Sequence, residues 1–235
     1  MKQHLIQLYG LFILLICTTQ AAFAQENNSK LGAWYMYFWD TQLNESQFGF
    51  QGDVQYRNWN IIGDLEQLLL RGGLTYRPKN ANIKLTLGYA YILTGADGID
   101  NTATSDESRI YQEALFPSKV GQRFYFNHRF RFEQRFVENQ DFRTRVRYNM
   151  FLNIPLNQLT LSKKAIYLAF YNEIFINGQK DIGNGNSVEL FDRNRLYCGL
   201  GYALKDNLRV QLALMNQTTN RASKNQLQFS IHHVF

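Results

Sequence analysis

Apolar and polar side chains alternate with a period of two along most of the chain. The clearest case is 123–136, where phenylalanines occupy one face and arginines with one glutamate occupy the other. Successive side chains of a β-strand point to opposite faces of the sheet, so this pattern predicts a strand with one apolar and one charged face. The same alternation recurs at 142–152, 193–202 and 227–235.

Gaps rich in turn-forming residues divide the chain into eleven such segments. We expect strands near 30–42, 47–58, 64–77, 82–93, 107–116, 119–136, 141–153, 164–176, 191–204, 206–216 and 225–235. Pro78, Pro117 and Pro155 fall between these segments, as expected for a residue that cannot donate to a strand ladder. The gaps at 94–107, 177–190 and 217–224 predict longer loops, whereas the others predict short turns.

The pattern favours an all-β fold, namely a transmembrane antiparallel up-and-down β-barrel. A water-soluble sandwich would also alternate, with its apolar face turned toward a core. The barrel is favoured because the pattern repeats so often, aromatic residues gather near segment ends, and the last segment ends in Phe235. A final aromatic residue of this kind resembles the signal that outer-membrane barrels present to the barrel-assembly machinery, so we expect that machinery and outer-membrane lipid as partners.

The number of strands follows less directly from the pattern. Bacterial single-chain barrels have an even number of strands, because both chain ends lie on the same side of the membrane. A count of eleven therefore suggests a misread boundary in the N-terminal part of the chain. We expect ten to twelve strands, with twelve favoured.

Residues 1–24 have a different character from the rest of the chain. Lys2 precedes an apolar run at 5–17, and 22–24 offers the small-x-small pattern that signal peptidase needs. These features predict a cleaved signal peptide (1–24) followed by one outer-membrane β-barrel domain (25–235), in a Gram-negative bacterium.

Two other interpretations of the N-terminal segment fit less well. A retained membrane anchor needs about 20 apolar residues, more than this run provides. A lipoprotein cut at Cys17 needs a small residue where Ile16 stands. After cleavage only Cys198 would remain, so no internal disulfide would hold the fold.

Several arginine-bearing segments resemble the family known as domain of unknown function 2490. The segments are Leu-Arg-Gly-Gly-Leu-Thr-Tyr at 70–76, Arg-Phe-Arg-Phe-Glu-Gln-Arg-Phe at 129–136, Arg-Thr-Arg-Val-Arg-Tyr at 143–148 and Asp-Arg-Asn-Arg-Leu-Tyr-Cys-Gly-Leu-Gly-Tyr at 192–202. The resemblance covers 32–235. It implies an outer-membrane barrel, and it carries over no activity, ligand or catalytic residue.

The polar faces of the predicted strands would line the lumen of such a barrel. The lining would consist of Arg57, Arg71, Arg123, Arg129, Arg131, Arg135, Arg143, Arg145, Arg147, Arg193 and Arg195, with the acids Asp53, Glu113, Glu133 and Glu173. Arginines outnumber acids, so we expect a positive interior. Rings of arginine favour anions, and guanidinium groups bind carboxylate and phosphate. The first functional hypothesis is therefore a small porin-like channel for passive passage of anionic solutes such as uronates, sialates or phosphates.

The second hypothesis is a filled structural or surface-interaction barrel. In it the arginines would pair with Glu113, Glu133 and Glu173 and stack on tyrosines, and the external loops 94–107 and 177–190 would make the contacts that matter. The stacking tyrosines would be Tyr125, Tyr167, Tyr171 and Tyr197. A barrel of ten to twelve strands can be filled or can leave a channel, so both hypotheses stay open.

An outer-membrane hydrolase is the third and least favoured hypothesis. His128 falls on an apolar face, but a lipase of that kind needs a serine two residues along, where Phe130 stands. The chain has no Gly-x-Ser-x-Gly, His-Glu-x-x-His or Cys-x-x-Cys motif. We therefore expect no enzyme activity and no catalytic residue.

Cofactors, metals and nucleic acid are likewise not expected as ligands. Asp97, Asp100, Asp106 and Glu107 gather in the predicted loop 94–107, without the spacing of a calcium-binding EF-hand. The sequence is basic, with a pI near 9.3. Its arginines alternate along strands instead of forming one exposed patch, which argues against nucleic acid.

Overall fold

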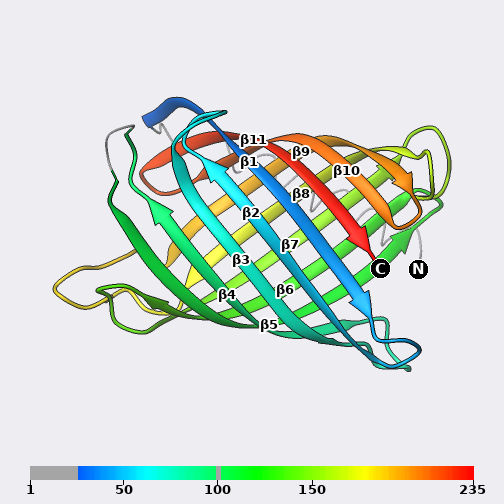
Figure 1. The fold of residues 1–235 in the computed structure, drawn as a ribbon, viewed down its shortest axis with the longest axis horizontal. Coiled ribbons are helices and arrows are strands. Elements are labelled where there is room, and N and C mark those ends of the chain that lie inside the picture. Colours follow the sequence, from blue (N-terminus) through cyan, green and yellow to red (C-terminus); the bar gives the residue numbers. More distant parts are fainter. Residues whose placement is uncertain (1–25, 99–101) are drawn as a thin grey trace.

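The computed structural model describes residues 26–98 and 102–235, which form a closed barrel of β-strands without a helix (Figure 1). The strands are β1 (Glu26–Gln42), β2 (Phe48–Asn58), β3 (Leu65–Tyr76), β4 (Lys84–Gly95), β5 (Thr104–Val120), β6 (Phe124–Val137), β7 (Arg143–Pro155), β8 (Ile166–Asn177), β9 (Phe191–Lys205), β10 (Leu208–Thr218) and β11 (Ala222–Val234). No helix in this described part is long and apolar enough to cross a membrane. The all-β barrel expected from the alternation is confirmed.

The barrel closes with an odd number of strands. Each strand pairs antiparallel with the next, and β1 pairs with β11 in parallel, with Ala33 opposite Leu227 and Asp40 opposite Val234. The preference for twelve strands, with ten as the alternative, is therefore wrong: the described residues form eleven. The even-number rule assumes that the closing pair is antiparallel, and each of the eleven predicted segments corresponds to one strand.

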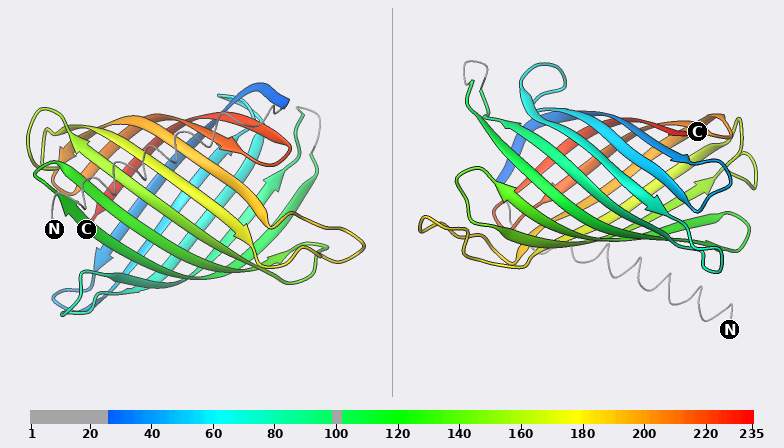
Figure 2. Two further views of the ribbon diagram at one scale, coloured as in Figure 1. Left: turned by 180° about the vertical axis from the view of Figure 1, so that it is seen from behind. Right: turned by 60° about the horizontal axis from the view of Figure 1, so that its bottom comes forward.

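The parallel closure places the start of β1 and the end of β11 at opposite rims (Figure 1). The connections at 59–64, 138–142, 178–190 and 219–221 share the rim where β1 starts, together with the end of β4 and the start of β5, and we call this the long-loop rim. The connections at 43–47, 77–83, 121–123, 156–165 and 206–207 form the short-turn rim. Figure 2 shows the 178–190 loop extending beyond the barrel wall.

Two local expectations need correction. The connection between β10 and β11 is the tight hairpin 219–221 and not a long loop at 217–224. Pro117 lies inside β5 and Pro155 is the last residue of β7, so neither lies between strands. Pairing between β4 and β5 ends at Lys84 and Leu115, so β5 has only β6 as a neighbour at Pro117, and a proline is tolerated there.

The two faces of the wall differ in chemistry. Apolar side chains point outward and stay exposed, with Leu87 58% and Leu214 59% exposed. The inward face is filled by charged, amide and aromatic side chains. Glycines make room for tyrosine rings there: a Cβ added to Gly201 would lie 2.1 Å from the ring of Tyr167.

Candidate functional site in the lumen

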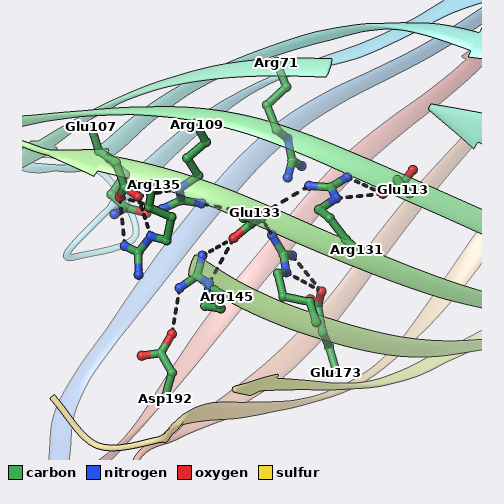
Figure 3. A network of polar contacts seen from close by, with 12 residues as sticks. Arg71, Glu107, Arg109, Glu113, Arg131, Glu133, Arg135, Arg145, Glu173 and Asp192 are labelled. Atoms are coloured by element: carbon green, nitrogen blue, oxygen red, sulfur yellow. Dashed lines mark hydrogen bonds and ion pairs between the residues drawn. The ribbon is translucent and has the colours of Figure 1, made fainter. Parts of the chain in front are cut away.

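A network of buried ion pairs occupies the lumen along β5 to β9 (Figure 3). Glu133 lies at its centre and is 1% exposed. One carboxylate oxygen of Glu133 accepts from Nη1 of Arg147 at 2.6 Å, and the other accepts from Nη2 of Arg145 at 2.7 Å. Arg109 and Arg131 each approach Glu133 to 3.9 Å. One carboxylate thus balances several guanidinium groups.

Glu173 and Glu113 extend the network toward the short-turn rim. Glu173 accepts from Arg147 at 2.6 Å and from Arg129 at 2.8 Å. Glu113 accepts from Arg131 at 2.5 Å. These links join β5, β6, β7 and β8. Glu113 directly faces Arg131, whereas Glu173 faces Asn149 and reaches Arg147 diagonally.

Glu107, Asp192 and Asp53 form ion pairs with further arginines. Glu107 accepts from Arg109 at 2.7 Å and from Arg135 at 2.5 Å. Asp192 accepts from Arg145 at 2.7 Å and from Arg193 at 3.1 Å, and Asp53 pairs with Arg71 at 2.8 Å. Most of the buried guanidinium groups therefore have a carboxylate partner.

The residues predicted to line the lumen fall into three groups. The ion-pair network contains Arg71, Arg129, Arg131, Arg135, Arg145, Arg147, Arg193, Glu113, Glu133, Glu173 and Asp53. Arg57, Arg143 and Arg195 are buried, and no carboxylate of the described residues lies within 4.0 Å of them. Arg123 lies at the short-turn rim, where it donates to the carbonyls of Pro155 and Leu156.

Sequence reasoning missed Glu107, Arg109 and Asp192. Glu107 was assigned to a loop because the neighbouring outward positions Asp106 and Ser108 are also polar, which hides the alternation. Glu107, Arg109 and Glu113 are separated by even numbers of residues, and this spacing could have revealed that Glu107 belongs to the polar face of a strand. A register shift between β8 and β9 adds Asp192 to β9, so a strict period of two does not predict that its carboxylate meets Arg145.

Arg57 and Arg195 lie against the same aromatic ring. Their guanidinium carbons are 3.8 and 4.8 Å from the ring centroid of Trp34. The polar partners of Arg57 are the amide oxygens of Gln55 and Gln67, and Nε of Arg195 donates to Gln217 at 2.8 Å. These two cations are therefore held by neutral groups.

The aromatic rings against which guanidinium groups lie differ from the tyrosines expected. They are Trp34, Tyr111, Phe151 and Phe175. Tyr171 and Tyr197 stack on each other with ring centroids 4.4 Å apart, and Tyr167 belongs to the same cluster. Tyr125 lies beneath Lys119.

A cavity of about 400 Å³ remains inside the lumen. Its basic lining residues are Arg57, Arg71, Lys84, Arg109, Arg129, Arg135, Arg145, Arg147, Arg193, Arg195 and Arg209, and its acidic lining residues are Glu107, Glu113 and Glu173. Amides of glutamine and asparagine and several aromatic rings complete the wall. The cavity is therefore polar, with more cations than carboxylates.

Of the residues considered for catalysis and metal binding, Glu107 lines this cavity, His128 does not, and Asp100 lies outside the described residues. His128 is on the outer face of β6, and its Nδ1 is 2.9 Å from the hydroxyl of Tyr148. Among the described residues, no group of three His, Cys, Asp or Glu side chains could hold a metal ion.

Comparison with known proteins gives one match. The model of the family described as protein of unknown function (DUF2490) matches residues 31–228. No curated protein and no solved structure matches the chain. The matched segment reaches from β1 into β11, so it contains the whole ion-pair network.

Proposed function

This chain belongs to the DUF2490 family, and we propose that its barrel spans a bacterial outer membrane and lets small anionic solutes pass through the lumen. The observation that carries the proposal is the excess of arginine and lysine over carboxylate on the cavity wall. A lumen with this balance lowers the barrier for anions and raises it for cations.

The outer surface supports a lipid environment. Leucine, valine and phenylalanine side chains are exposed along the strands, and Leu87, Leu212 and Leu214 are each more than half exposed. So large an apolar surface is unfavourable in water. The strands have 11 to 17 residues, and a membrane-spanning strand needs about 9–11. Trp39, Tyr76 and Tyr202 lie near the short-turn rim, and Tyr35 and Tyr56 near the long-loop rim, as aromatic girdles do.

The connections support an orientation. Outer-membrane barrels have short periplasmic turns and longer extracellular loops. The longest connection between described strands, 178–190, would therefore lie outside, and the short-turn rim would face the periplasm although its connection 156–165 has ten residues.

A second candidate function is a filled barrel whose external loops bind a partner. The extent of ion pairing around Glu133 favours it, because four arginines and one carboxylate occupy the middle of the lumen. The cavity of about 400 Å³ and its unpaired cations favour passage instead.

Solute entry into liposomes distinguishes the two candidates. Protein expressed from the full-length chain and purified from membranes in detergent would be reconstituted, and swelling would be followed in galactose and in potassium galacturonate, with valinomycin present so that potassium can accompany the anion. The two solutes have similar size and differ in charge. Faster swelling in galacturonate supports the proposal, whereas no swelling from correctly folded protein contradicts it and favours the filled barrel.

A further inference from the structure

Two buried cations in the lumen share one aromatic ring and have no carboxylate partner. Arg57 comes from β2 and Arg195 from β9, and both guanidinium groups lie within 5 Å of the centroid of Trp34. Arg57 is 6% exposed and Arg195 is 8% exposed. Other lumen arginines that are equally buried, such as Arg131 and Arg147, have a carboxylate at hydrogen-bond distance.

A buried pair of like charges is costly without a counter-ion. Transfer of an ionised group out of water is strongly unfavourable unless it is paired, and two neighbouring guanidinium groups also repel each other. The aromatic ring and the amide oxygens of Gln55, Gln67 and Gln217 offset only part of this cost. An anion bound in the cavity beside the two arginines would offset the rest.

The two arginines can reach such an anion. Both line the cavity of about 400 Å³. Within the described residues, Nη1 and Nη2 of Arg195 donate no hydrogen bond to a protein acceptor, and neither atom is sealed from the cavity. A planar guanidinium group with free terminal nitrogens matches the two oxygens of a carboxylate.

The uncharged side chains of the cavity indicate which groups the ligand has besides its negative charge. Gln51, Gln55, Gln67, Asn149, Gln211 and Gln228 line the same cavity. An amide side chain both donates and accepts, so this lining suits a ligand with several hydroxyl groups. The partly exposed ring of Tyr171, which stacks on Tyr197 and also lines the cavity, offers apolar surface for the C–H groups of such a ligand. The cavity lies at the small end of the volume range for ligand pockets.

We propose that Arg57 and Arg195, held beside Trp34, form the anion-binding site of the lumen and that its ligand is a small polyhydroxylated carboxylate of the sugar-acid class. This inference rests on the proposed function, since it assigns the solute and the site that selects it. The carboxylate contacts the free terminal nitrogens of Arg195, Arg57 adds a second positive charge beside the same ring, and the hydroxyl groups contact the amide side chains.

Calorimetric titration of the detergent-purified protein tests the site without requiring transport. Galacturonate is the probe, with galactose and galactose 6-phosphate as comparison ligands. The structure predicts binding of galacturonate and none of galactose. Arg57→Gln and Arg195→Gln should each weaken galacturonate binding about tenfold or more, the value of one lost charge-assisted pair. Arg123→Gln removes the same charge at the short-turn rim and should leave the affinity unchanged.

Each alternative outcome overturns the inference in a recognisable way. Equal affinity in Arg195→Gln and the unaltered protein shows that the site lies elsewhere. Tighter binding of galactose 6-phosphate than of galacturonate shows that the ligand of the site is a sugar phosphate and not a sugar carboxylate. Absence of binding to folded protein rejects the site, and the proposed function is then judged separately by the swelling assay.

A folding control accompanies the substitutions. Because neither arginine pairs with a carboxylate, Arg57→Gln and Arg195→Gln should fold and keep the electrophoretic mobility of the folded barrel. Arg57→Lys and Arg195→Lys retain the charge and lose the planar group, so they provide folded variants with weakened galacturonate binding. Unchanged affinity in both lysine variants overturns the two-oxygen contact with the carboxylate.

Discussion

Glu133 and Arg147 meet in the middle of the lumen with 2.6 Å between a carboxylate oxygen and Nη1. They are diagonal neighbours on β6 and β7, because the residue directly opposite Glu133 is Arg145. A diagonal contact leaves the direct one free, so a single carboxylate binds both arginines. Arg145 and Arg147 of β7 are therefore neutralised from β6, β8 and β9.

Loss of the central carboxylate should be strongly destabilising. Glu133→Gln leaves Arg145 and Arg147 with less compensation in a buried site, and breaking a buried ion pair costs about 3–5 kcal/mol. Urea unfolding in detergent, followed by tryptophan fluorescence, measures the change. Glu45→Gln removes the same charge from the exposed turn between β1 and β2 and should change stability by less than about 0.5 kcal/mol. Equal effects of the two substitutions would contradict the role given to Glu133.

The strands were predictable from the sequence, but the closure of the barrel was not. Alternation is a local property, so it located 164–176 and 191–204 within about two residues of β8 and β9, and 119–136 covered nearly all of β6 but began five residues too early. Whether β1 meets β11 in parallel depends on contacts between residues far apart in sequence, and no local pattern encodes it. Because the direction of pairing between the first and last strands was not known, the strand number was assumed to be even, and this assumption led to the wrong count.

The lumen was predictable only in part, for a similar reason. A period of two placed Arg129, Arg131 and Arg145 on polar faces, and in the structure these faces turn inward. It could not reveal that Asp192 adds a carboxylate through a register shift. Nor could it bring Arg195 to the ring of Trp34, because that contact joins β9 to β1 across the lumen.

Close packing of glycine against tyrosine should limit substitutions in the wall. A Cβ at Gly201 would lie 2.1 Å from the ring of Tyr167, which is almost fully buried. Gly201→Ala should therefore destabilise the barrel by about 1–3 kcal/mol, the usual cost of overpacking. Gly72→Ala is the matched control, because nothing lies within 4 Å of its added Cβ. The same urea unfolding measures both, and a stable Gly201→Ala variant would show that the ring moves aside easily.

Disulfide cross-linking tests the parallel seam between β1 and β11. In a Cys198→Ser background, the pair Tyr35→Cys with Phe229→Cys and the pair Tyr37→Cys with Ile231→Cys should both cross-link, because each joins partners in the parallel register. Adjacent strands place such cysteines within reach of a disulfide.

The control for this experiment combines Tyr37→Cys with Leu227→Cys. An antiparallel seam centred on Tyr35 and Phe229 would bring these two positions together, whereas the parallel register separates them. Cross-linking of the control pair in place of Tyr37→Cys with Ile231→Cys would contradict the observed closure. Mobility on a non-reducing gel after mild oxidation gives the readout.

The most direct measurement of the central claim is the reversal potential of the purified protein in a planar bilayer under a potassium chloride gradient. Because cations exceed carboxylates on the cavity wall, the account predicts a steady conductance whose reversal potential has the sign of the chloride equilibrium potential. A reversal potential with the sign for potassium, or no conductance from correctly folded protein, would contradict it.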